Sequence, residues 1–302
     1  MKKNKFFILA LAAFSTTLLV FAGCSKKESS KSIDIEKLKA SAPALESEFE
    51  VKLTSDSNGV IIKQYKGEYK PGKPIPLVIP ATIQGLPVKE IGGNAFDKMS
   101  YLLPDFSAVV IPEGVEIIGT SAFNAQEELV TVVLPSSLKV INSNAFCVNK
   151  KLTTIKLPEN LMKIGPGAFS GTGLTSIDLP EGLLVIEGAA FADTPLTTVT
   201  LPKSLKVLNE YAFAGCNNLA EINIPDGLSV ANISGTGYKD GKLNFRIQNL
   251  EPITFDNIFS GAKIKESLAL QKKLKEYKTV SLVYLKLKRD ARGDVYSSDW
   301  NW

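Results

Sequence analysis

Apolar and polar positions follow one pattern that is written five times between Val109 and Phe213. The clearest copy reads Leu174-x-x-Ile177-x-Leu179-Pro180-x-x-Leu183-x-x-Ile186-x-x-x-Ala190-Phe191. The other copies differ by conservative exchanges and centre on Ile111-Pro112, Leu134-Pro135, Leu157-Pro158 and Leu201-Pro202. Their prolines are 23, 23, 22 and 22 residues apart. A fixed period of this length predicts a solenoid in which each copy forms one coil.

Each coil is predicted to contain one short strand and one inward-turning return. In the third copy, Leu152, Ile155 and Leu157 mark the inward face of the strand, and Pro158 ends it because proline cannot donate to a ladder. A single coil cannot bury these groups, so neighbouring coils must cover one another. We therefore expect one aromatic column through the core, made of Phe123, Phe146, Phe169, Phe191 and Phe213.

This repeat resembles the BspA-like branch of the bacterial leucine-rich repeats, over about residues 49–262. The resemblance implies a β-rich solenoid of about 22–23 residues per coil. It also implies a surface-associated protein that binds other proteins and is not an enzyme. It does not imply which partner is bound, because such solenoids recognise partners through variable surface residues.

The first 23 residues have the pattern of a signal peptide. Three lysines precede an apolar run, and small residues follow before Cys24. This resembles a bacterial lipoprotein signal, in which the cysteine becomes the first mature residue and carries lipid such as palmitate. Phe21 departs from the commonest leucine of that signal. The alternative is an ordinary secretory signal in which Cys24 has no special role.

Acylation at Cys24 would anchor the chain to a membrane, since two or more acyl chains bind stably and one binds only marginally. Residues 24–41 are polar and are predicted to be a tether. After the signal region, no apolar run is long enough to cross a bilayer. The expected location is the cell envelope, on its outer surface.

Two caps are predicted to close the solenoid of residues 77–262. Residues 42–76 contain an alternating strand pattern with a turn at Ser57-Asn58-Gly59, which predicts a hairpin cap. Residues 263–302 are predicted to be a second cap, with a helix from Ile264 to Tyr277 and a strand from Val280 to Leu287. Between the regular coils and this cap, residues 235–241 read as a loop and residues 253–262 as a half-coil.

The first coil, around Pro80 and Phe96, is irregular. The interval between these two residues is 16 where the other coils have 11, and extra residues also follow Phe96. Either insertion is predicted to be a binding loop or a tolerated irregularity at a coil corner.

The composition excludes several kinds of chemistry. The chain has no histidine, which removes the usual general base and the histidine metal ligands. Cys147 and Cys216 lie three coils apart, too far for a disulfide, and are expected to be small fillers beside the phenylalanines. Carboxylates pair at Glu127-Glu128, but no deep cleft is predicted around them, so nothing favours glycoside hydrolysis. We expect no cofactor and no metal.

Charge does not point to nucleic acid either. Three of the lysines behind the formal net charge of +4 lie in residues 1–23, which leaves +1 for the rest of the chain. No nucleic-acid partner is therefore expected.

Recognition is then left to residues that the coils turn outward. Along each strand, the positions on either side of the middle inward residue must face out. We predict partner-binding residues at Val110, Val133, Thr154, Lys156, Ser176, Asp178, Thr198 and Thr200, with Ala108, Thr131, Glu221 and Asn223 in the same rows. A second outward row contains Ile117, Val140, Val185, Val207 and Val230 and is interrupted by Lys163. A continuous β-branched strip would be larger than solvent usually sees, unless a cap or loop covers it.

One short motif near the end of the chain is Arg292-Gly293-Asp294, the tripeptide that integrin ligands present. A triplet of this kind also arises by chance, so it is a weak candidate.

The sequence therefore favours a lipid-anchored surface protein that binds proteins, in adhesion or host interaction. The alternative is an envelope or periplasmic scaffold lipoprotein that contacts the organism's own proteins. An enzyme would need a catalytic pair that the sequence does not offer.

Overall fold

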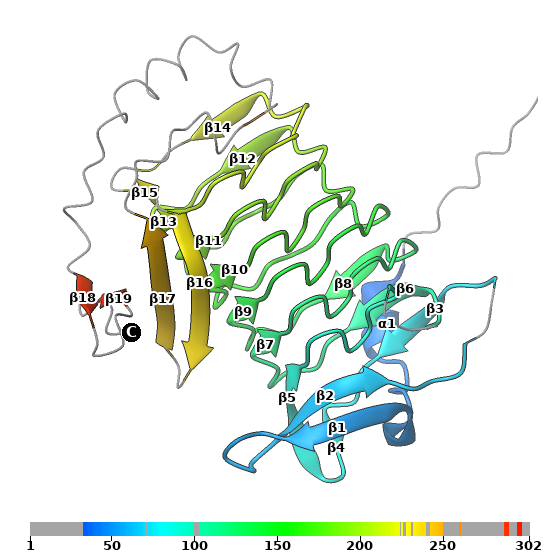
Figure 1. The fold of residues 1–302 in the computed structure, drawn as a ribbon. Coiled ribbons are helices and arrows are strands. Elements are labelled where there is room, and N and C mark those ends of the chain that lie inside the picture. Colours follow the sequence, from blue (N-terminus) through cyan, green and yellow to red (C-terminus); the bar gives the residue numbers. More distant parts are fainter. Residues whose placement is uncertain are drawn as a thin grey trace, which may run out of the picture. The chain divides into compact units, whose positions relative to one another are not determined.

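A computed structural model describes residues 33–69, 72–99, 103–223, 225, 228–230, 232–239, 242–249, 260, 287–289 and 295–297. Its repeated coils stack in parallel, and strands occupy two opposite sides of the stack (Figure 1). One side, here called sheet A, runs in the order β1-β2-β5-β7-β9-β10-β11-β13-β15. The other side carries β3, β6 and β8 followed by β12 and β14. The hydrophobic core lies between these two sides.

Sheet A is built mainly from two-residue strands, one in each coil. Its members are β1 (Phe49–Leu53), β2 (Val60–Tyr65), β5 (Leu86–Ile91), β7 (Ile117–Ile118), β9 (Val140–Ile141), β10 (Lys163–Ile164), β11 (Val185–Ile186), β13 (Val207–Leu208) and β15 (Ser229–Val230). From β5 onward the pairs are parallel and in register, for example Ile164 beside Ile141 and Ile186. The short strands suit coils that must turn at both ends of each strand.

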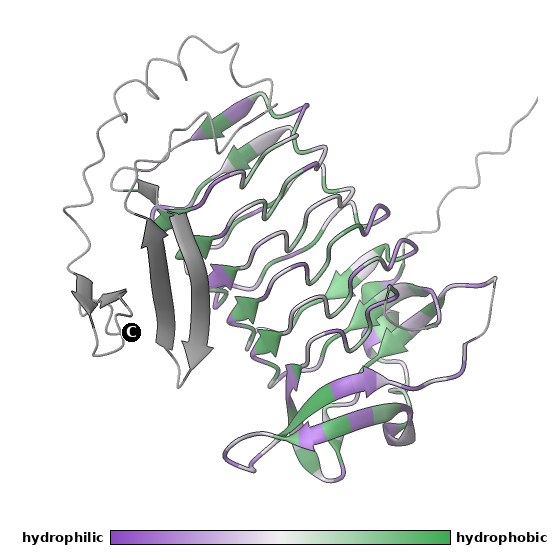
Figure 2. Cartoon of the chain, in the orientation of Figure 1, coloured by the Kyte–Doolittle hydropathy of each residue, from purple (hydrophilic) through white to green (hydrophobic). Residues whose placement is uncertain are grey.

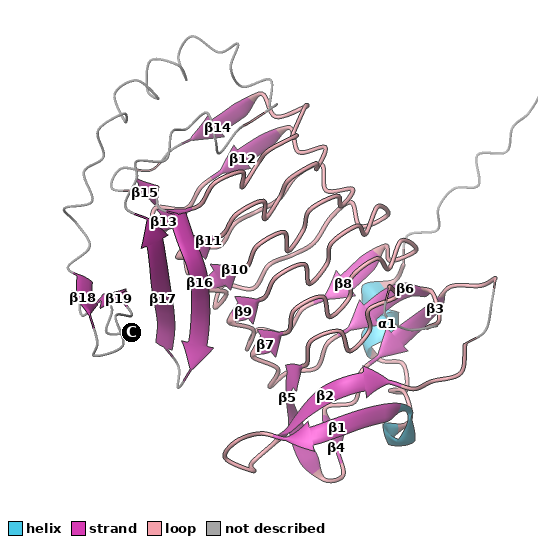
Figure 3. Cartoon of the chain, viewed as in Figure 1, coloured by secondary structure: helices cyan, strands magenta, loops and turns pink. Residues whose placement is uncertain are grey.

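The opposite side carries the strands that the repeat predicted. They are β3 (Ile75–Val78), β6 (Phe106–Val110), β8 (Thr131–Val133), β12 (Thr198–Thr200) and β14 (Glu221–Asn223). The predicted strand from Leu152 to Leu157 is not formed, and the chain there is drawn as a loop between β8 and β12 (Figure 3). Its three marked residues are buried all the same. The break falls where the coil length changes from 23 to 22 residues.

The aromatic column is confirmed. Successive rings from Phe96 to Phe213 lie with their centroids 4.8 to 5.5 Å apart and their planes within 8° of parallel. Phe96 therefore extends the predicted column by one ring. At its first end, Phe49 and Phe106 pack edge-on against Phe96. Offset stacking of this kind adds to the burial of apolar area.

A row of buried polar side chains accompanies the phenylalanine column, three residues after each ring from Phe123 to Phe213. The Thr172 and Thr194 hydroxyls donate to the carbonyls of Phe169 and Phe191, each at 2.8 Å. Gln126 and Asn149 donate to phenylalanine carbonyls of the preceding coil. Buried carbonyls at the coil corners are thereby satisfied without a regular ladder.

The corners on both sides of each phenylalanine from Phe123 to Phe213 adopt left-handed backbone conformations. Two residues after the ring, φ is 67° at Gly171, 70° at Gly215 and 60° at Val148. Glycine reaches this region freely, whereas a β-branched residue there is strained. The coil at Val148 therefore holds a residue that its backbone disfavours.

The chain before the first coil forms a hairpin and a short helix. β1 and β2 pair antiparallel around the predicted turn, where Ser57 has a φ of 59°, and β2 pairs in parallel with β5. The insertion in the first coil is a tight turn at Gln84-Gly85 that pairs β4 (Thr82–Ile83) with β5. Residues 46–48 form a 3-10 helix, η1 (Glu46–Glu48).

The helix α1 (Ile35–Lys39) lies inside the segment predicted to be a tether. Asp34 caps it by accepting a hydrogen bond from the Lys37 N–H at 3.1 Å, and Leu38 is buried. The Asp34 cap and the three-residue spacing of Ile35 and Leu38 were the signals for this helix in the sequence. The polar composition of the surrounding residues hid them.

The last coil is interrupted by a hairpin of β16 (Asn232–Lys239) and β17 (Lys242–Asn249). Residues 235–241 were predicted to be a loop. That prediction was wrong for residues 235–239, which lie in β16. The Gly215 N–H donates to the Ser260 carbonyl at 2.8 Å, as Asp193 does to Ala214 one coil earlier. The coil thus resumes at Ser260 after the hairpin, and Phe259 precedes it in the sequence.

The chain after Ser260 is described only in part. β18 (Leu287–Arg289) pairs antiparallel with β19 (Val295–Ser297). The predicted helix from Ile264 to Tyr277 and most of the strand predicted from Val280 lie outside the described residues.

Candidate functional site

We call one outward surface of the coils the strand face. It is formed by β6, β8, β12, β14 and the extended segments 154–156 and 176–178. Most of the predicted partner-binding residues are exposed on it: Thr154, Lys156, Ser176, Asp178, Thr198 and Thr200. Val110 and Val133 are half-buried. The prediction for Ala108 was wrong, because this side chain is buried. The strand face is thus open over its middle and last coils and partly covered over its first.

Helix α1 lies beside the partly covered end of the strand face. It contacts β3, the strand that pairs with β6, and Ile35 lines a groove together with Thr131 of β8. Ile35 keeps 43% of its surface exposed, so the helix forms one wall of an open groove. The groove has a volume of about 500 Å³ and reaches from Ile35 to Pro180.

Charged and hydroxyl side chains of three coils meet in this groove. Its lining includes Thr131, Thr154, Lys156, Glu159 and Asp178. Four of these come from the predicted outward rows. Ile35 and Glu159 were missed, because the helix was not predicted and Glu159 follows the proline that ends the strand. A side chain beyond that corner can still reach the face, since adjacent coils place Leu179 and Pro180 beside it.

No other described residue forms an ion pair or side-chain hydrogen bond with Lys156, Glu159 or Asp178. These three side chains are exposed. Their charges are therefore available to a molecule that enters the groove.

The second outward row is buried, contrary to the prediction. Val140, Val185 and Val207 have at most 1% of their surface exposed, and Ile117 is half-buried. Val207 pairs with Ser229, so Ser229 continues the row and Val230 lies beside Leu208. The prediction placed Val230 one residue off because the coil from Val207 measures 22 residues. This row offers no open apolar strip.

Lys163 interrupts the buried row as a charged residue. Its Nζ lies 3.2 Å from Oε2 of Glu187 in the next coil, and both side chains are less than 5% exposed. In Figure 2, β10 is accordingly a hydrophilic strand between apolar neighbours. Desolvation lowers the pKa of Lys163, and the Glu187 carboxylate opposes that shift. This pair is part of the packed interior and not of an accessible site.

A second groove lies at the corner where the irregular first coil adjoins the next. It has a volume of about 570 Å³, and its lining includes Lys98, Met99, Asp105, Glu127 and Glu128. The sequence predicted no deep cleft beside Glu127 and Glu128, and this groove is open to solvent. Extra residues after Phe96 create it, and the lengths of such insertions do not reveal their path.

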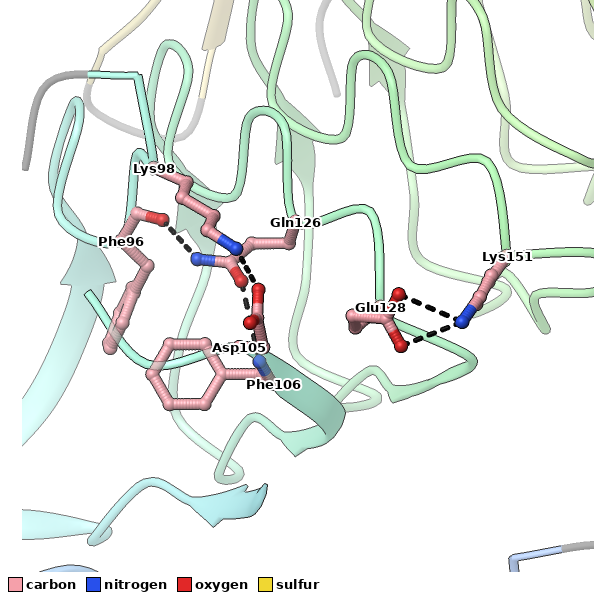
Figure 4. Close-up of polar contacts among 7 residues, drawn as sticks. All are labelled: Phe96, Lys98, Asp105, Phe106, Gln126, Glu128 and Lys151. Carbon is pink, nitrogen blue, oxygen red and sulfur yellow. Dashed lines mark hydrogen bonds and ion pairs between the residues drawn. The ribbon is translucent and has the colours of Figure 1, made fainter. Parts of the chain in front are cut away.

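The charges of this corner groove are paired with neighbouring side chains, and Figure 4 shows the pairs Lys98–Asp105 and Glu128–Lys151. Lys98 pairs with Asp105, and Lys151 contacts both oxygens of Glu128 at 2.7 and 2.8 Å. Lys150 lies 3.5 Å from Glu127. Each carboxylate thus faces a lysine, so the charges of this groove are paired within the described chain.

The two cysteines of the coils are free thiols. Cys216 is buried, and its Sγ lies 3.1 Å from the Phe191 carbonyl and 3.2 Å from the Thr194 hydroxyl. It therefore belongs to the polar row beside the phenylalanines and is more than an apolar filler. Burial raises the pKa of both Cys147 and Cys216, which disfavours the reactive thiolate.

Within the described ranges, His, Cys, Asp and Glu side chains nowhere gather in threes that could hold a metal ion. None of the helices described is both long and apolar enough to span a bilayer. Cys24 and the Arg292-Gly293-Asp294 motif lie outside the described residues.

A family model described as a BspA type leucine rich repeat region, in six copies, matches residues 81–194, 141–265 and 184–288. These matches together span more than half of the chain. A search of curated proteins returns no match.

Solved structures of leucine rich repeat proteins are similar to this one. A leucine rich repeat protein of T. pallidum is 35% identical with a TM-score of 0.56, and the alignment covers 63% of this chain and 86% of that one. The pneumococcal vaccine antigen PcpA is 25% identical with a TM-score of 0.51, over 68% of this chain and 54% of that one. A leucine rich cell surface protein of Faecalibacterium prausnitzii is 24% identical with a TM-score of 0.43, over 68% and 59%. The repeats, the stacked coils and the family match agree, and the chain belongs to the BspA type leucine rich repeat family.

Proposed function

We propose that this chain is a lipid-anchored bacterial surface protein that binds other proteins through its strand face, in adhesion or host interaction. The observation that carries the proposal is the difference in exposure between the two rows that were predicted to face outward. The row through Thr154, Ser176 and Thr198 is exposed, whereas the row through Val140, Val185 and Val207 is buried. Recognition rather than catalysis is the use that an exposed, regularly spaced row best supports.

The strand face is tested by capture of partners from extracts. The chain is used as bait against host matrix and, separately, against an envelope extract of the bacterium. Arginine is placed at Ser176 and Thr198, which are exposed, because changes at the half-buried Val110 and Val133 would also affect stability. Thr120→Arg is the matched control, since Thr120 is an exposed threonine at a coil corner.

The double variant should lose its captured proteins while its melting temperature stays unchanged, and the control should retain them. Capture that survives in the double variant would refute the strand face as the binding surface. A partner found only in the envelope extract would support a scaffold role in place of host binding.

The anchor is proposed at Cys24, on the strength of the signal pattern before it. Metabolic labelling with a radioactive or clickable fatty acid tests this. The label should appear on the wild-type chain and disappear in Cys24→Ala. Location at the outer surface is tested by adding protease to intact cells, where a surface protein is cleaved and a periplasmic one is protected.

A further inference from the structure

The two grooves of the described chain differ in how their charges are used. In the corner groove, Asp105, Glu127 and Glu128 each form an ion pair with a lysine. In the strand-face groove, Lys156, Glu159 and Asp178 hold no partner among the described residues. An exposed charge stays hydrated, so leaving it unpaired lowers the stability of the free protein only slightly. The same charges can form new bonds when a partner excludes the water.

The balance of these charges favours a basic guest. The lining holds two carboxylates, of Glu159 and Asp178, and one ammonium group, of Lys156, so the groove carries an excess of one negative charge. The hydroxyls of Thr131 and Thr154 provide further acceptors in the same lining. Ile35 supplies an apolar wall on the side of the helix, suited to the methylene stem of a long side chain.

An arginine fits this combination better than a lysine. A guanidinium carries five donors in a plane and can bond to a carboxylate and a hydroxyl at once, whereas an ammonium acts as a compact, strongly hydrated charge. Exposed aromatic and arginine anchors, which usually dominate protein interfaces, are absent from the lining of this groove. The anchor must then come from the partner.

We propose that the strand-face groove receives an arginine side chain from an extended segment of the protein partner, with Glu159 and Asp178 as its acceptors. This inference rests on the proposed protein-binding function and specifies the chemistry of the partner. A volume of about 500 Å³ accommodates the arginine together with neighbouring residues of the segment. Lys156 lies in the same lining and disfavours a second basic residue beside the first.

The test uses the full chain in detergent and a fluorescein-labelled peptide, Gly-Ser-Arg-Ser-Gly, followed by fluorescence anisotropy. A peptide with citrulline in place of arginine has the same shape without the charge. The arginine peptide should bind at least about fivefold more tightly than the citrulline peptide. The double variant Glu159→Gln/Asp178→Asn should remove that difference, and Lys156→Met should strengthen arginine binding.

The matched control is Glu127→Gln/Glu128→Gln, which removes the same number of carboxylates from the corner groove. It should leave arginine binding unchanged. Equal binding of the two peptides, no binding of either, or an equal loss in the control would overturn the proposal.

Failure here is distinguishable from failure of the proposed function. If the Ser176 and Thr198 variant loses its captured partner but the arginine peptide does not bind, the strand face remains the binding surface and only the arginine specificity is wrong. If the peptide binds as expected but capture survives in that variant, the groove is a basic-residue site and the proposed function is wrong.

Discussion

Lys163 and Glu187 form an ion pair across adjacent coils, with 3.2 Å between Nζ and Oε2 and almost no solvent contact. The coils before and after this pair carry uncharged residues at the two equivalent positions. Val140 is followed two residues later by Asn142, and Val207 by Asn209. Lys163 therefore occupies a valine position in an otherwise apolar row, and Glu187 occupies an asparagine position.

Removing one member of this pair should destabilise the chain strongly. Lys163→Met leaves the Glu187 carboxylate buried without its cation, which we expect to lower the free energy of unfolding by about 3 kcal/mol. The double variant Lys163→Val/Glu187→Asn, which copies the neighbouring coils, should cost much less. Urea unfolding followed by circular dichroism measures both. A double variant as unstable as the single one would show that the pair itself is needed.

The buried hydroxyl of Thr194 offers a second test. Thr194→Val removes one of the two donors to the Phe191 carbonyl and leaves only the weaker Cys216 thiol, at an expected cost of about 1 kcal/mol. Thr198→Val changes an exposed threonine in the same coil and should be close to neutral. The comparison of their melting temperatures isolates the buried bond, and equal effects would contradict its role.

Strain at Val148 predicts a stabilising substitution. Its φ of 60° suits glycine, which already occupies the equivalent position as Gly171 and Gly215. Val148→Gly should raise the free energy of unfolding by about 0.5 to 1 kcal/mol, as relief of strain outweighs the entropy gained by the unfolded chain. Ala125→Gly, at the same corner without a β-branched side chain, should gain less. A loss of stability at Val148 would indicate that its packing outweighs the strain.

The Glu113 carboxylate predicts a dependence of stability on pH. It accepts hydrogen bonds from the Ser136 N–H at 3.0 Å and the Ser136 hydroxyl at 2.9 Å, and these lower its pKa below 4.5. A lowered carboxyl pKa stabilises the fold above pH 4.5 and loses that contribution as pH falls through the folded value.

Glu113→Gln should therefore reduce the loss of stability on acidification below pH 4.5. The effect should stay below about 1 kcal/mol because the side chain is largely exposed. Thermal unfolding at a series of pH values measures it. Glu181→Gln tests the equivalent corner three coils later, and identical pH curves for wild type and Glu113→Gln would remove the proposed contribution.

Local pattern was sufficient to predict the phenylalanine column and the exposed row of the strand face. Phe146, Phe169 and Phe191 had to stack, because a residue that recurs at the coil period can only be buried against its own copies. The exposure of Thr154, Ser176 and Thr198 followed from strand alternation for the same reason. Family, repeat length and the exposed row could all be read from that period.

Features that depend on segments outside the period were decided by the tertiary structure. Helix α1 lies in a segment of polar composition, and the hairpin of β16 and β17 is inserted into the last coil. Spacing cannot predict such contacts, because an insertion or a terminal segment has no repeated copy that fixes where it packs. The groove beside Ile35 arises in this way, because helix α1, which has no repeated copy, lies against the regular strand face.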